Sequence, residues 1–170
     1  SVSERAQYVR DHTDLFIARS QRAKAALICE GVEAERIRVV GHGVDMEAFH
    51  PGPPDQKLRD LFNIDRDQFV FLFVGHMLWP KGIFSIAQAA KLLLQNKSKC
   101  DRRPVFLMVG QGDELGSVQN LVNTLGLDDY FRFVGYQKYE MLPSIHRLVD
   151  AFLLPSISTR TIQEQFGIAI

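Results

Sequence analysis

Apolar runs alternate with segments of helical spacing along most of the chain. The runs at residues 69–74, 105–109 and 131–134 contain few polar positions, as strands buried on both faces of a parallel sheet do. A shorter apolar run, at residues 151–154, follows later. Between the first two runs, residues 83–95 repeat at helical spacing with one apolar side. This order predicts a doubly wound α/β fold with a parallel sheet.

The remaining elements are placed by the same patterns. Further helices are predicted at 56–62, 117–125 and 139–148. Two helices and two short strands are predicted near the start of the chain, at 3–11, 21–30, 15–20 and 36–40. His-Pro-Gly-Pro-Pro-Asp at 50–55 is the strongest structure-breaking sequence. We therefore predict a boundary between residues 1–50 and residues 51–170.

Composition narrows the class of protein. Apolar residues make up 46% of the chain and charged residues 24%, which suits a globular domain with a real core. Twenty Lys and Arg balance twenty Asp and Glu, so no overall charge draws the molecule to nucleic acid. Cys29 and Cys100 fit neither a zinc pattern nor a disulfide framework. The two cysteines therefore suggest a reducing compartment. No apolar run is near the roughly 18 residues of a membrane helix, and we expect a cytoplasmic protein.

Glycines directly after three predicted strands indicate a binding edge. They are Gly75, Gly110 and Gly135. Loops at the carboxyl ends of parallel strands lie along one edge of the sheet, where such folds bind ligands. Gly112 adds a second position at which backbone can approach a ligand closely, and Lys81 precedes a predicted helix. There an ammonium and helix amides can face one anion together.

Other site types fit the chain less well. The loop with Lys81 lacks the spacing of a phosphate-binding Walker A element, and Gly110, Gly112 and Gly116 give GxGxxxG rather than the dinucleotide spacing GxGxxG. No GxSxG nucleophile motif occurs. A single lysine or histidine in a loop is more often a solvated or hydrogen-bonded structural residue than a functional one.

The segment Glu164-Gln165-Phe166-Gly167 follows the last predicted strand through a polar loop. A carboxylate and an exposed-backbone glycine at such a strand-to-helix junction can meet sugar hydroxyls and phosphate oxygens. The helix that starts near Phe166 has only about one turn before residue 170, too short to be stable by itself. We therefore predict that residues 158–170 are either poorly ordered or held by contacts with a partner or a crystal lattice.

Taken in order, six short stretches resemble the retaining GT-B glycosyltransferases of the family 4 type. They are VVGHGVDMEAFHP (39–51), FVGHMLWPKG (73–82), MVGQGD (108–113), FVGY (133–136), LPS (154–156) and EQFG (164–167). The resemblance is to the C-terminal, donor-binding half of these enzymes. It implies a Rossmann-like half of a GT-B fold that is cut at its C-terminus.

The resemblance also implies a donor site. Lys81 matches the lysine that binds the donor diphosphate, and Glu164 matches the first glutamate of the Glu-x7-Glu motif, which contacts the donor sugar; both are expected to be catalytic. The other implied donor-binding residues are Gly75, His76, Gly110, Gly112, Tyr136, Gln165, Phe166 and Gly167. His76 replaces an arginine of the family, and a neutral imidazole cannot replace a bidentate guanidinium. His42 likewise replaces the common asparagine.

The implied function is transfer of a glycosyl group, with retention of configuration, from a nucleotide-diphospho-sugar to a carbohydrate, lipid-linked or other acceptor. Base contacts are expected from backbone near residues 135–137. Residues 1–50 would be the tail of the acceptor-binding domain and the interdomain crossover. Residues 51–170 would be an incomplete nucleotide-sugar-binding domain, inactive without the rest.

No metal or other cofactor is expected, because Lys81 and helix amides would supply the positive charge. An N-terminal acceptor domain would allow peripheral association with the inner face of the membrane. Two alternatives stay open. One is a GT-B epimerase or phosphorylase. The other is a non-catalytic nucleotide-binding module, which is supported by His42 and His76, the two positions that differ from the family pattern.

Overall fold

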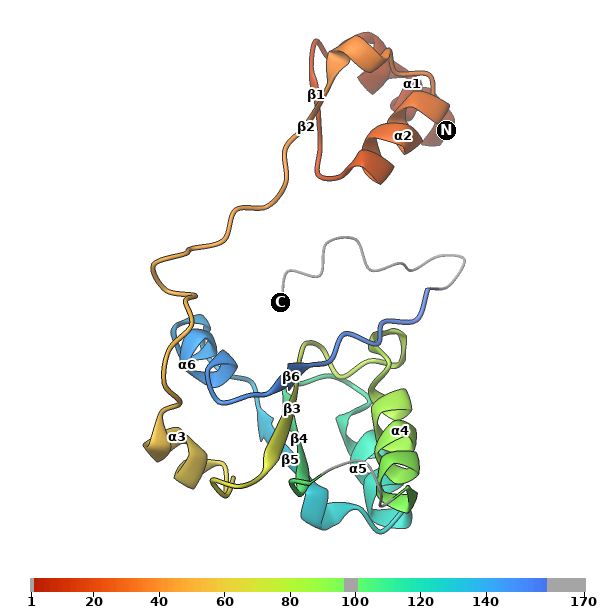
Figure 1. Ribbon diagram of the computed structural model, residues 1–170. Coiled ribbons are helices and arrows are strands. Elements are labelled where there is room, and N and C mark those ends of the chain that lie inside the picture. Colours follow the sequence, from red (N-terminus) through yellow and green to blue (C-terminus); the bar gives the residue numbers. More distant parts are fainter. Residues whose placement is uncertain (1, 97–100, 159–170) are drawn as a thin grey trace. The chain divides into compact units, whose positions relative to one another are not determined.

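The computed structural model describes residues 2–96 and 101–158. The chain divides into two compact units, Ser1–Asp45 and Met46–Ile170, which are described separately (Figure 1). The first unit contains α1 (Val2–Asp11), β1 (Phe16–Ala18), α2 (Gln21–Cys29) and β2 (Ile37–Val39). The second contains α3 (Gln56–Leu61), β3 (Phe69–Val74), α4 (Ile83–Gln95), β4 (Pro104–Val109), α5 (Leu115–Thr124), β5 (Phe131–Gly135), α6 (Leu142–His146) and β6 (Ala151–Phe152).

The first unit is a small β–α–β arrangement. Strands β1 and β2 pair in parallel, with Phe16 opposite Ile37. Helix α2 starts at Ser20, whose hydroxyl accepts a hydrogen bond from the Ala23 N–H at 3.1 Å, as N-cap serines do. Its core contains Ala18, Val32 and Ile37. The predicted elements of this part of the chain are therefore confirmed, with shorter strands.

The second unit is a parallel four-stranded sheet in the order β5-β4-β3-β6. The chain builds β3, β4 and β5 outward in one direction and then returns to place β6 on the other side of β3. This reversal makes the gap between β3 and β6 a topological switch point, where open α/β sheets bind ligands at the carboxyl ends of the strands. The predicted doubly wound parallel sheet is confirmed.

Helices cover both faces of this sheet. Helices α4 and α5 pack on one face and α3 and α6 on the other (Figure 1). Because side chains alternate along a strand, Phe71 faces one layer and Leu72 the other. Phe71, Phe106 and Phe131 stand side by side on three paired strands, with ring centroids 4.9 Å apart at each step. These ring contacts help to hold the strands that carry the candidate site.

Three predicted boundaries change. Gly116 lies inside α5 rather than in the preceding loop, because the helical hydrogen bond from Val118 N–H already reaches the Glu114 oxygen, at 3.0 Å. The helix predicted at 139–148 is divided into a 3-10 turn and the short α6, which has a proline in its first turn. Strand β6 ends at Phe152. The prediction about the order of residues 158–170 concerns a segment that, from residue 159 onward, lies outside the described residues.

No helix among residues 2–96 and 101–158 is both long and apolar enough to span a bilayer.

An ion pair joins the starts of three strands. The Arg102 guanidinium binds both carboxylate oxygens of Asp150, with Nη1–Oδ1 2.7 Å and Nη2–Oδ2 3.2 Å. The Val70 N–H donates to Asp150 Oδ2 at 2.8 Å. Burial raises the pKa of Asp150, but the hydrogen bonds from Arg102 and Val70 outweigh it, so the pKa lies below its ordinary value.

We expect Asp150→Asn to lower the free energy of unfolding at neutral pH by about 0.5–1 kcal/mol, since the pair is partly exposed and screened. A lowered folded-state pKa stabilises the fold above the unfolded value, about 4. That stability is lost as pH falls through the folded pKa. Urea unfolding at several pH values should therefore show the difference between the two proteins shrinking below pH 4. A difference of the same size at pH 7 and pH 3 would contradict this role of the charge.

Candidate functional site

The loops that follow β3, β4 and β5 surround a hollow of about 420 Å³. It is lined by Val74, Gly75, His76, Val109, Gly110, Gln111, Gly112, Tyr136, Gln137 and Leu142. The structure thus brings together five residues that the sequence singled out: Gly75, His76, Gly110, Gly112 and Tyr136. The hollow lies at the carboxyl edge of the sheet, as predicted.

Backbone-to-backbone contact between the loops depends on Gly110. Its φ is +134°, a value that residues with a Cβ rarely adopt. A Cβ at this position would overlap the carbonyl oxygen of Gly75. The Gly110 N–H donates to the Gly135 oxygen at 2.8 Å, and the Gly75 N–H donates to the Val109 oxygen at 3.0 Å. Three loops are therefore joined through their backbones.

A second contact lies one step further along the same two loops. A Cβ at Gly112 would lie 2.5 Å from the Met77 carbonyl oxygen. Met77 is fully buried, and its N–H donates to the Gln111 oxygen at 2.9 Å. The loop after β3 therefore lies directly against the loop after β4. This contact fixes the start of the loop segment that leads to Lys81.

Lys81 ends a 3-10 turn, Trp79–Lys81, that lies at the switch point. Gly82 follows with φ +75°, and a Cβ there would overlap the carbonyl oxygen of Pro155. The Ile157 N–H donates to the Pro80 oxygen at 2.7 Å. The turn is thus packed against the segment that follows β6. Lys81 belongs to the same loop as Gly75 and His76, although it does not line the hollow.

The other predicted site residues cannot be placed. Glu164, Gln165, Phe166 and Gly167 lie outside the described residues. The segment that leads to them, 155–157, packs on the Lys81 turn. The structure therefore describes the segment between the Lys81 turn and residues 164–167 as far as residue 158.

Several residues of the site were not singled out in the sequence, among them Gln111, Leu142 and Glu114. Gln111 and Leu142 line the hollow, and Glu114 accepts a hydrogen bond from the Trp79 N–H through Oε2. Gln111 stands between two predicted glycines, so its position alone was a usable signal. Leu142 reaches the hollow because of the way α6 packs, and Glu114 reaches Trp79 because of the path of the loop after β4. A local sequence pattern does not reveal either contact.

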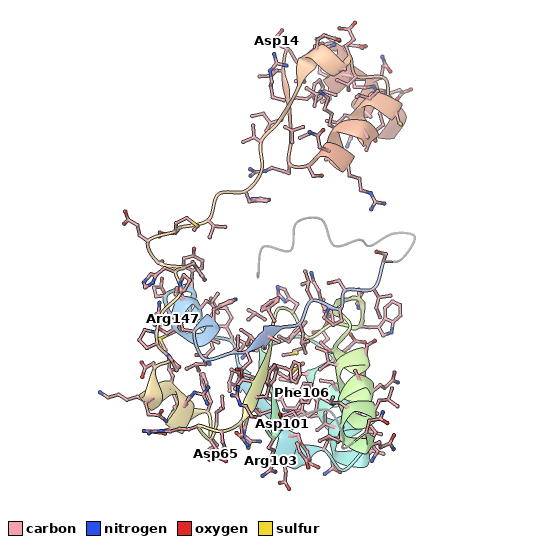
Figure 2. The ribbon with its side chains drawn as sticks, viewed as in Figure 1. Asp14, Asp65, Asp101, Arg103, Phe106 and Arg147 are labelled. Carbon is pink, nitrogen blue, oxygen red and sulfur yellow. The ribbon has the colours of Figure 1, made fainter. Side chains whose placement is uncertain are left out.

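The sequence contains an Asp-x-Asp triplet, Asp65-Arg66-Asp67, a type of motif that can hold a metal ion. It precedes β3 and therefore lies at the edge opposite the hollow. Figure 2 shows Asp65 at the same end of the unit as Asp101 and Arg103. In the part of the chain that the structure describes, no three His, Cys, Asp or Glu residues are grouped to hold a metal.

A doubly wound parallel sheet with glycine loops at its carboxyl edge is the architecture of many nucleotide-binding α/β proteins. Within that class, the family model "Glycosyl transferases group 1" matches residues 54–170. The chain belongs to this family of glycosyltransferases.

Similar proteins carry names of the same kind. An Escherichia coli protein, UDP-Gal:alpha-D-GlcNAc-diphosphoundecaprenol alpha-1,3-galactosyltransferase, is 32% identical over 129 residues, which cover 74% of this chain and 32% of that protein. The D-inositol 3-phosphate glycosyltransferase of Gordonia bronchialis is 29% identical over 169 residues, covering 95% of this chain and 35% of that protein. This chain therefore spans about a third of the length of these relatives.

A solved structure supports the fold. The Anabaena protein HepE, crystallised with UDP and glucose, matches with a TM-score of 0.76 at 24% identity, covering 98% of this chain and 43% of that one. The chain thus has the α/β architecture of GT-B glycosyltransferases and corresponds to under half of such a protein.

We expect Gly110→Ala to destabilise the protein by about 2–4 kcal/mol, because a strained φ and an overlap with Gly75 add together. Gly116→Ala is the matched control. Gly116 lies in α5 with no atom within 4 Å of its Cβ position, so alanine there should stabilise by about 0.5–1 kcal/mol.

Urea unfolding followed by the fluorescence of Trp79 compares the two variants. Equal stability of G110A and wild type would show that the contact between the loops after β3 and β4 does not contribute to the free energy of unfolding.

Proposed function

We propose that this chain is the donor-binding part of a retaining glycosyltransferase that uses a UDP-sugar. The observation that carries the proposal is the Lys81 turn, packed at the switch point beside a glycine-lined hollow. The UDP in the related Anabaena structure and the UDP-Gal in the Escherichia coli name support uridine diphosphate as the carrier.

The hollow suits the nucleoside. Its wall is largely apolar, and Gly110 and Gly112 are among the residues that line it. Gln111 and Gln137 add amide groups that can both donate and accept hydrogen bonds. We assign the base and ribose to this hollow, which leaves the diphosphate to extend toward the Lys81 turn.

The Lys81 turn suits the diphosphate. It leads directly into α4, a helix of 13 residues, whose first N–H groups have no partner within the helix and carry partial positive charge. As the bond from sugar to phosphate breaks, negative charge grows on the β-phosphate. A lysine and helix amides aimed there stabilise that charge more in the transition state than in the ground state.

Other parts of the proposal rest on the resemblance to family 4 enzymes. They are retention of configuration, contact of Glu164 with the donor sugar, residues 1–50 as the end of an acceptor-binding domain, and independence of a metal. The acceptor is a carbohydrate, lipid-linked or other molecule, and the enzyme is cytoplasmic and able to associate with the inner face of the membrane. Transfer requires the complete enzyme.

The epimerase, phosphorylase and non-catalytic readings are not favoured, since the relatives described above are named as glycosyltransferases.

We expect Lys81→Ala to weaken UDP binding about 10- to 100-fold, the cost of losing a hydrogen bond to a charged group. The same substitution should weaken the binding of UMP, which lacks the β-phosphate, much less. Isothermal titration with both nucleotides measures the difference, and EDTA should leave wild-type binding unchanged.

The matched control is Lys57→Ala, which removes an equal charge from the exposed side of α3. Its UDP affinity should stay within about two-fold of wild type, as for most surface substitutions. Equal UDP affinity of K81A and wild type would reject the assignment of the diphosphate to this turn. No UDP binding by wild type would reject the proposed donor.

A further inference from the structure

Glu114 contacts the Lys81 loop with both its side chain and its backbone. Its carboxylate Oε2 accepts a hydrogen bond from the Trp79 N–H, although the two residues are 35 positions apart in sequence. Its own N–H donates to the Met77 oxygen at 3.2 Å. Glu114 stands at the N-cap of α5, yet its side chain makes no capping bond to that helix. The carboxylate is used on the neighbouring loop instead.

We infer that Glu114 is a positioning residue for Lys81. The Glu114 carboxylate holds the first residue of the 3-10 turn whose last residue is Lys81, and so sets where the ammonium stands relative to the donor diphosphate. This role rests on the proposed function. It adds to the site a residue from a different loop, one that does not line the hollow.

The turn needs such support because it is short. A single 3-10 turn has poor hydrogen-bond geometry and is marginal alone. Here it is held from two sides. The Ile157 N–H donates to the Pro80 oxygen at 2.7 Å on one side, and Glu114 accepts from Trp79 on the other. Loss of either contact frees the backbone that carries Lys81.

Variants that remove the charge of Glu114 can show whether Glu114 acts by holding Trp79 or by its charge alone. A carboxylate near a diphosphate weakens anion binding by repulsion. If Glu114 acted through its charge, every variant without that charge would bind UDP more tightly. If it acts by holding Trp79, glutamine should replace it, since an amide oxygen accepts the same bond, whereas alanine should not.

The first measurement needs no ligand. We expect hydrogen exchange of the Trp79 amide to rise about ten-fold or more in Glu114→Ala and to stay near wild type in Glu114→Gln, because one lost hydrogen bond of about 1.4 kcal/mol corresponds to ten-fold. Trp79 is the only tryptophan of the chain, so its fluorescence reports on the same turn. Unchanged exchange in E114A overturns the inference.

The second measurement compares UDP with UMP. We expect E114A to bind UDP about 5- to 10-fold more weakly than wild type and UMP equally well, while E114Q binds both as wild type does. Asp113→Ala, the loss of a neighbouring exposed carboxylate, is the matched control and should bind both normally. If E114A does not fold, Glu114→Asp replaces it, since a side chain shorter by one methylene no longer reaches Trp79.

The outcomes separate this inference from the proposed function. Weaker UDP binding in K81A with wild-type binding in E114A overturns the role of Glu114 alone. Equal losses of UDP and UMP in E114A also overturn it, because they indicate general damage to the site. Absence of UDP binding in wild type overturns the proposed function and, with it, the positioning role.

Discussion

The close approach of three loop backbones at the carboxyl edge of the sheet is the constraint on which the rest of the site depends. Gly110 lies against Gly75, Gly112 against Met77, and Gly82 against Pro155. Each contact leaves no space for a Cβ, so these loops can meet only where the sequence provides glycine. The result is an edge at which the positions of the loops are fixed by contacts between their backbones.

The sheet makes this edge a binding site. Its strand order places the loop after β3 next to the segment after β6, and this switch point receives the Lys81 turn. Phenylalanines on β3, β4 and β5 stack across the strands below. At the opposite edge Arg102 and Asp150 join the strand starts. A rigid sheet thus carries a preformed edge, which favours recognition of a small, charged ligand.

The sequence predicted most of the fold because its signals are local. Apolar runs gave β3, β4 and β5, and helical spacing gave α4 with its bounds. Gly75 and Gly110 were recognised as site residues because they directly follow strands. Glu114 and Leu142 were not, since their roles depend on contacts between segments far apart in sequence. Gly116 was misplaced because a glycine at the first turn of a helix resembles a loop residue.

Amide chemical-shift mapping of the chain with UDP would locate the bound nucleotide on the sheet. We expect the largest changes at Gly75–Gly82, Gly110–Gly112 and Gly135–Gln137, along the carboxyl edge. Amides near Gln68 and Arg102, at the opposite edge, should not move. Changes centred on that opposite edge, or none at saturating UDP, would show that the carboxyl edge is not the donor site.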